Sequence, residues 1–180
     1  MSATRVRTTA LGVGAVLAAF VLLLWLAPDD PDREGTVAVV GRAAPAIDAT
    51  DTEGRPVRLA DYRGQWLLVN FFATWCVPCR AEHPELVAFR EAHRDAGDAS
   101  VLSVAYDEEP AVIAEFFRTN GGDWPTIAEG ADRYVLEYGV VKLPESFLID
   151  PDGTVVHKFA GGVRAAEVDA VIERAARGRT

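Results

Sequence analysis

The chain has 180 residues, of which 49 % are hydrophobic, and its formal net charge is −9. This length is enough for one membrane-anchoring segment and one folded domain of ordinary size. Because binding to phosphate requires clustered lysine and arginine, an acidic chain without such a cluster is not typical of nucleic-acid-binding proteins. The 2 cysteines are too few for a framework of several disulfides, and the 3 histidines lack the close spacing of zinc ligands, so we expect no metal site.

Residues 10–27 carry no charged side chain and approach the roughly 20 apolar residues that a membrane-spanning helix requires. Arg5 and Arg7 precede this run and an acidic segment follows it, which by the positive-inside rule places residues 1–9 in the cytoplasm. We therefore expect an uncleaved transmembrane signal anchor that crosses the cell membrane once, with the rest of the chain on the extracytoplasmic side. A cleaved signal peptide is the alternative, although Pro28 just beyond the run disfavours cleavage.

Residues 28–41 are expected to form a linker, because they are acidic, contain proline and glycine, and lack a helical period. Residues 42–180 are expected to form one domain. Its apolar periodicity and turn residues predict the following elements in chain order: strands at 46–50 and 56–59, a short turn at 59–64, a strand at 66–72, a helix at 78–94, a strand at 100–105, a helix at 110–119, an edge strand at 124–127, a helix at 131–138, strands at 146–149 and 154–159, and a helix at 164–177.

The alternation of strands and helices predicts an α/β fold with a central sheet flanked by helices. The run at 66–72, WLLVNFF, is almost continuously apolar, which suits a central strand covered on both faces. The two final strands are joined by a strong turn signal and add an antiparallel edge, so the sheet is expected to be mixed.

The only cysteines, Cys76 and Cys79, follow this central strand and lie at the start of the next helix. Free N–H groups and the helix dipole at that position favour a thiolate on Cys76, and the thiolate is the nucleophile in disulfide exchange. Cys79 lies one turn further on, where it can attack a mixed disulfide and release the partner. The pattern therefore predicts a redox-active dithiol.

Two stretches carry a family resemblance: residues 69–82, VNFFATWCVPCRAE, and residues 139–150, GVVKLPESFLID. They resemble the membrane-anchored thioredoxin-like proteins of the TlpA/ResA/CcmG (DsbE) group. The resemblance implies a thioredoxin fold with an N-terminal β-hairpin and a helix-strand insertion, for which residues 110–127 fit. It also implies a cis peptide bond between Leu143 and Pro144 that faces Cys76, where the free backbone groups can pair with an extended substrate.

The same resemblance draws attention to two acidic residues. Glu82 can share a helical face with Cys79, and burial would raise its pKa enough for it to exchange a proton with that cysteine. A solvated helix glutamate is the alternative. Glu145 matches an acid of the cytochrome c maturation branch and is expected to help bind substrate, the alternative being a simple exposed side chain.

Four further residues have expected roles. Leu143 and Pro144 are expected to contact substrate, and Trp75 to shield the dithiol and offer a flat apolar contact, with a core tryptophan as the alternative. His83 is expected to be a solvated helix residue. Asn70, the polar member of the central strand, is expected to satisfy nearby backbone groups.

The function implied by the resemblance is reduction of the apocytochrome c cysteines before haem attachment, with electrons from a membrane donor of the CcdA/DsbD type and without a bound cofactor. Three alternatives remain at this stage: a general reductase for other secreted proteins, an oxidase that installs disulfides, and a non-catalytic binding module. A peroxidase is disfavoured, because that chemistry usually needs a threonine three residues before the reactive cysteine, and Ala73 occupies that position.

Overall fold

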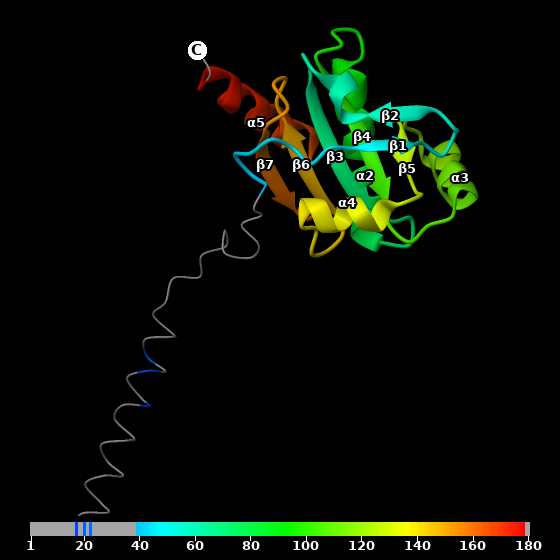
Figure 1. Cartoon of the computed structure of the whole chain (residues 1–180), viewed down its shortest axis with the longest axis horizontal. Coiled ribbons are helices and arrows are strands. Elements are labelled where there is room, and N and C mark those ends of the chain that lie inside the picture. Colours follow the sequence, from blue (N-terminus) through cyan, green and yellow to red (C-terminus); the bar gives the residue numbers. More distant parts are fainter. Residues whose placement is uncertain (1–16, 18–19, 21, 23–38, 179–180) are drawn as a thin grey trace, which may run out of the picture. The chain divides into compact units, whose positions relative to one another are not determined.

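The computed structural model describes residues 17, 20, 22 and 39–178 (Figure 1). The chain divides into two units, residues 1–34 and 35–180, and the elements named below all belong to the second. Residues 17, 20 and 22 are helical; the other positions of the predicted anchor at 10–27, the N-terminus at 1–9 and most of the linker at 28–41 lie outside the described residues. Among the residues described, none of the helices has the length and apolar character that a membrane crossing requires.

A five-stranded mixed sheet forms the centre of the domain, in the order β5-β4-β3-β6-β7. Its strands are β3 (Trp66–Phe72), β4 (Ala99–Ala105), β5 (Thr126–Ile127), β6 (Glu145–Ile149) and β7 (Val155–Ala160). β3 pairs in parallel with β4, and β4 with β5. On the other side of β3 the pairing is antiparallel, first with β6 and then between β6 and β7. All seven residues of β3 are buried, which explains its nearly continuous apolar sequence.

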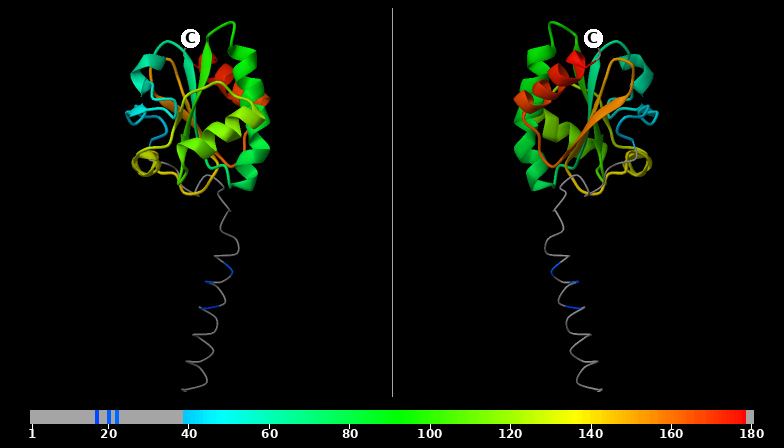
Figure 2. Two further views of the ribbon diagram at one scale, coloured as in Figure 1. Left: turned by 90° about the vertical axis from the view of Figure 1, so that its right-hand side faces the viewer. Right: turned by 90° about the vertical axis from the view of Figure 1, so that its left-hand side faces the viewer.

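Helices cover both faces of this sheet (Figure 2). On one face lie α2 (Val77–His93) and α5 (Ala165–Arg177), packed over Leu68, Val101 and Leu148. The opposite face is covered by α4 (Ala131–Tyr138) and by a separate hairpin of β1 (Asp48–Thr50) and β2 (Pro56–Arg58), which a short 3-10 helix, η2 (Leu59–Tyr62), follows. The hairpin reaches the sheet through Thr52, whose N–H donates to the carbonyl of Thr126 at 2.9 Å.

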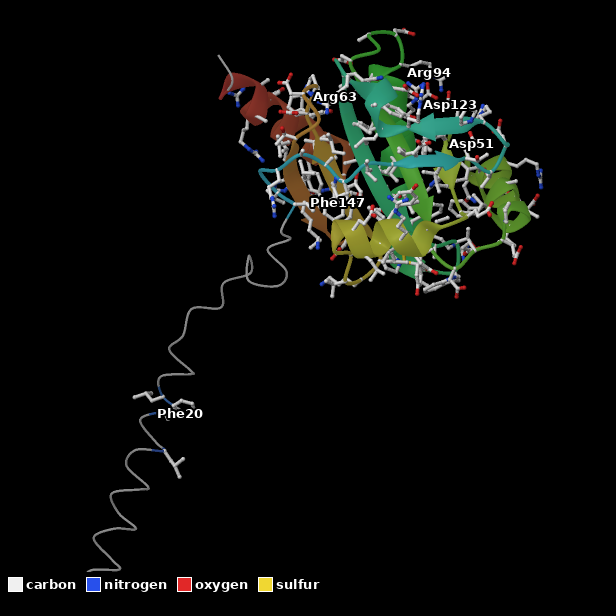
Figure 3. All side chains as sticks on the ribbon, viewed as in Figure 1. Phe20, Asp51, Arg63, Arg94, Asp123 and Phe147 are labelled. Carbon is white, nitrogen blue, oxygen red and sulfur yellow. A yellow bond between two sulfur atoms is a disulfide. The ribbon has the colours of Figure 1, made fainter. Side chains whose placement is uncertain are left out.

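The segment from β4 to α4 contains the expected insertion, made of α3 (Pro110–Asn120) and β5. Asp123, between α3 and β5, forms ion pairs with Arg90 at 3.3 Å and Arg94 at 3.0 Å, both on α2 (Figure 3). These contacts attach the insertion to the helix that begins at the two cysteines.

The predicted α/β fold with a central mixed sheet is confirmed, and the predicted elements differ from the observed ones by at most two residues at either end. The predicted position of the short strand at the sheet edge is also confirmed, since β5 pairs on one side only. The start of the domain could not be read from local pattern: the N–H of Gly41 donates to the carbonyl of Val155 at 2.7 Å, so this end of the predicted linker is attached to β7.

Candidate active site

Cys76 and Cys79 form a disulfide at the start of α2, with an S–S distance of 2.14 Å. Cys76 is the N-cap of the helix, and the N–H of Cys79 donates to its Sγ at 3.3 Å. Both residues are buried, at 6 % and 2 % exposure. After reduction the same N–H group and the helix N-terminus would stabilise a thiolate on Cys76. The arrangement can therefore perform thiol-disulfide exchange.

The turn that leads from β3 into α2 is held by an acid that the sequence did not single out. The N–H of Cys76 donates to the carbonyl of Ala73 at 3.2 Å, which closes the turn. The N–H and the hydroxyl of Thr74 both donate to Oε1 of Glu108, at 2.8 and 2.5 Å. Glu108 follows β4, and because β3 and β4 are parallel neighbours, their carboxyl ends meet at one edge. The parallel pairing of β3 with β4 is thus the one feature from which the contact between Thr74 and Glu108 could have been predicted.

Glu82 lies on α2, the helix that begins at the dithiol, and is buried at 4 % exposure. Its Oε2 accepts the N–H of Val163 at 3.0 Å and its Oε1 accepts the side-chain amide of Asn70 at 2.8 Å. Burial raises the pKa of Glu82 to about 7, although these two hydrogen bonds act in the opposite direction. The alternative of a solvated helix glutamate is therefore wrong. Near neutral pH this carboxyl can both hold and release a proton.

Asn70 has a different role from the one expected. Its Nδ2 donates to Oε1 of Glu82 at 2.8 Å and to the hydroxyl of Ser146 at 3.0 Å, so it links two side chains rather than backbone groups. Ser146 lies directly opposite Asn70 in the pairing of β3 with β6. The network thus connects the dithiol helix with the strand that follows Pro144.

The peptide bond between Leu143 and Pro144 is cis, as the resemblance implied. Pro144 is buried, and Leu143 packs against the apolar cluster that contains both cysteines. Trp75 is 60 % exposed, so it is not a core tryptophan, and Val77 is exposed as well. An apolar surface therefore lies beside a disulfide that is itself almost covered.

Glu145 is not the exposed acid of the simpler alternative, because it is 2 % exposed. Its Oε2 lies 2.8 Å from Nζ of Lys158, whose side chain is also buried, and it accepts the N–H of Val141 at 3.2 Å. Successive residues of a strand point to opposite faces, so Glu145 and Ser146 face opposite sides of the sheet. Lys158 gave no sequence signal, since only the pairing of β6 with β7 brings it here.

The expectation that His83 is solvated is wrong. His83 is 3 % exposed and lies against the rings of Phe116, Phe117 and Trp124. Its Nε2 donates to the carbonyl of Gly121 at 2.9 Å. Desolvation lowers its pKa, because burial disfavours the imidazolium form, although the hydrogen bond to Gly121 raises it. His83 thus joins α2 to the insertion.

Comparisons with known proteins agree with this geometry. A sequence model of the AhpC/TSA family matches residues 40–158. The thiol-disulfide oxidoreductase ResA of Geobacillus thermodenitrificans is 33 % identical over 140 residues, which cover 78 % of this chain and 80 % of the relative. ResA of Bacillus subtilis strain 168 is 34 % identical over 122 residues, 67 % of each chain.

A solved structure shows the same arrangement of elements. The crystal structure of a thiol:disulfide interchange protein of the thioredoxin family from Chlorobium tepidum TLS superposes with a TM-score of 0.67 at 28 % sequence identity. The match covers 74 % of this chain and 94 % of that chain. The region matched by the family model, residues 40–158, contains both cysteines, Glu82 and the cis bond before Pro144.

Proposed function

The chain belongs to the AhpC/TSA family and is a thiol-disulfide oxidoreductase with a thioredoxin-like fold, and from this premise we propose that it is a membrane-tethered reductant of apocytochrome c. In this proposal residues 10–27 anchor the chain in the cell membrane, and the catalytic domain acts on the extracytoplasmic side. The single observation that carries the proposal is the buried Cys76–Cys79 pair at a helix start, packed against Leu143 beside the cis bond. The names of the ResA relatives support the reaction type.

Reduction of a substrate disulfide proceeds in two exchanges. The Cys76 thiolate attacks one substrate sulfur, so a mixed disulfide forms and the other substrate sulfur leaves as a thiolate. The Cys79 thiolate then attacks Sγ of Cys76, which releases the second substrate thiol and leaves the Cys76–Cys79 disulfide. Two electrons have passed to the substrate. A membrane dithiol donor of the CcdA/DsbD type returns the pair to the reduced form, and no bound cofactor takes part.

Glu82 supplies the proton transfer that the second exchange needs. Cys79 must lose its thiol proton before it attacks, and a carboxyl with a pKa of about 7 accepts a proton readily at neutral pH. Glu82 lies one helical turn after Cys79, in the same α2 helix. In the proposal Glu82 is the general base for Cys79, while the substrate lies against the exposed Trp75 and the half-buried Leu143, next to the cis bond to the buried Pro144.

The test is to trap the first intermediate. A full-length Cys79→Ala variant, expressed in its native membrane, is expected to accumulate a mixed disulfide between Cys76 and its substrate, and Cys76→Ala is the matched control that retains none. Mass spectrometry of the trapped partner identifies the substrate. Recovery of apocytochrome c supports the specific proposal, whereas a broad set of secreted proteins indicates the general reductase.

The direction of the reaction has a separate test. A reducing and an oxidising protein of this fold differ by about 150 mV in reduction potential, which equilibration with glutathione resolves easily. A potential near that of the strong oxidants, about −120 mV, would contradict the reductant role and favour the oxidase. The peroxidase remains disfavoured, because the residue at the position of the required threonine is the buried Ala73.

A further inference from the structure

A buried ion pair lies behind the loop that carries the cis bond. Glu145 is the first residue of β6, immediately after Pro144, and Lys158 is in the neighbouring strand β7. Their charged atoms are 2.8 Å apart, with side-chain exposures of 2 % and 8 %. Nζ of Lys158 also lies 5.5 Å from the ring centroid of Phe147. The Glu145 carboxylate is thus covered by protein and paired, which argues against direct contact with a substrate.

The same carboxylate holds the middle of the loop between α4 and β6. Oε2 of Glu145 accepts the N–H of Val141 at 3.2 Å. The loop is fixed at its start by the N–H of Val140, which donates to the carbonyl of Val135 at 2.9 Å, and at its end by the carbonyl of Pro144, which accepts the N–H of Gly161 at 3.0 Å. Glu145 therefore connects the backbone of this loop to the sheet between those two fixed ends.

We propose that Glu145, with its charge balanced by Lys158, is a positioning residue that sets the Leu143–Pro144 segment against the dithiol and so determines the affinity for protein disulfides. A carboxylate accepts a stronger hydrogen bond from an N–H group than a neutral oxygen does. Such a charge is costly to bury alone, and Lys158 offsets this cost. Because Leu143 packs against the cluster that contains Cys76 and Cys79, movement of the loop changes the surface that an extended substrate meets.

The test compares two double variants of the full-length chain that both remove the two charges. Glu145→Gln/Lys158→Met keeps an oxygen that can accept the Val141 N–H, whereas Glu145→Leu/Lys158→Met does not. Replacement of a buried ion pair by apolar groups is often neutral for folding, so both are expected to fold, which circular dichroism checks. Each variant is reduced and assayed with two substrates. Insulin is a protein disulfide, whereas hydroxyethyl disulfide has no backbone to lie along the loop.

The glutamine variant is expected to keep a KM for insulin near that of wild type. The leucine variant is expected to raise this KM by about fivefold to tenfold, the effect of losing one buried hydrogen bond, with its rate toward hydroxyethyl disulfide unchanged. An equal rise of the KM for insulin in both variants would overturn the proposal and would indicate a direct contact between the Glu145 charge and the substrate. No rise in either would show that the pair is only structural.

This inference rests on the proposed reduction of protein disulfides, and the two can fail separately. If wild type reduces neither insulin nor hydroxyethyl disulfide, the proposed function is wrong; if wild type reduces both and the two double variants behave alike, only the role of Glu145 is wrong. Should the leucine variant not fold, Val141→Pro removes the same hydrogen bond from the donor side. That variant is then expected to show the same selective rise in KM for insulin, and an unchanged KM would overturn the proposal.

Discussion

Glu82 gives the oxidised protein a pH dependence of stability that can be worked out from its surroundings. In the folded chain burial raises its pKa to about 7, whereas the ordinary value is 4.5. Between these two pH values the folded chain keeps a proton that the unfolded chain has already released. Folding is therefore favoured by this group at low pH, and the contribution is lost as pH rises from 4.5 through 7.

The size of the effect follows from the difference between the two pKa values. The shift of 7 − 4.5, or 2.5, corresponds to about 3 kcal/mol at roughly 1.4 kcal/mol per pH unit. Glu82 is only 4 % exposed, so screening by solvent reduces this figure little. A loss of that size is a large part of the free energy of unfolding of an ordinary domain, about 5–15 kcal/mol.

The assay is guanidinium unfolding of the oxidised full-length chain at a series of pH values from about 4 to 8, for wild type and for Glu82→Gln. The amide keeps one accepting oxygen and so is mispaired with one of the two donors, Asn70 and Val163, at every pH; this penalty cancels when slopes are compared. Wild type is expected to lose about 3 kcal/mol more than the variant over this range. Glu91→Gln, an exposed position on the same helix, is the matched control and is expected to follow wild type.

Two results would refute the reasoning. Parallel curves for wild type and Glu82→Gln would mean that Glu82 titrates at its ordinary value, and the carboxylate would then be a much weaker base toward the thiol of Cys79. A loss of slope in Glu91→Gln equal to that in Glu82→Gln would mean that the pH dependence comes from the total acidic charge and not from burial of one carboxyl.

Three further predictions concern single residues. The buried hydroxyl of Thr126 has no hydrogen-bond partner among the described residues. Thr126→Val is therefore expected to raise the free energy of unfolding, measured by guanidinium denaturation, by about 1 kcal/mol. A decrease would indicate that the hydroxyl forms a hydrogen bond. Trp75→Ala removes an exposed ring, so unfolding should change by less than about 0.5 kcal/mol while the KM for insulin rises severalfold; an unchanged KM would remove Trp75 from the substrate surface. Burial lowers the pKa of His83, so its contribution to the free energy of unfolding is present above pH 6.5 and is lost as pH falls below that value. His83→Gln keeps a donor toward the carbonyl of Gly121 and should abolish this loss on the acid side. A plot of unfolding free energy against pH with the same acid-side slope as wild type would contradict the prediction.

Most of the fold could be predicted, because each element carries its own local signal. The run of apolar β-formers at 66–72 defines the central strand, and glycine or proline marks the ends of several helices. The hairpin at 48–58 required only its turn residues. What could not be predicted is the pairing of Gly41 with Val155, because nothing local distinguishes the end of a linker from a segment that pairs with a distant strand.

The site divides in the same way. Cys76 and Cys79 were recognisable from their spacing at the start of a helix, and Pro144 because the stretch around it resembles a known family. The environments of Glu108, Lys158 and His83 were not, because each depends on which strands or helices become neighbours. His83 in particular follows Glu82 on a helix whose exposed face could not be assigned until the insertion was seen to cover it.

The position of β6 has a consequence for the order in which the site is assembled during synthesis. β6 is an internal strand of the sheet, between β3 and β7, yet it is made after β3, β4 and β5. A growing chain therefore contains both cysteines well before Pro144 and Ser146 exist, and at that stage β3 has one unpaired edge. Until β6 pairs with β3, such a chain has both cysteines and an unpaired strand edge but lacks the Leu143–Pro144 segment beside them. The Leu143–Pro144 segment, on which the proposed substrate surface depends, is thus among the last parts of the site to be made.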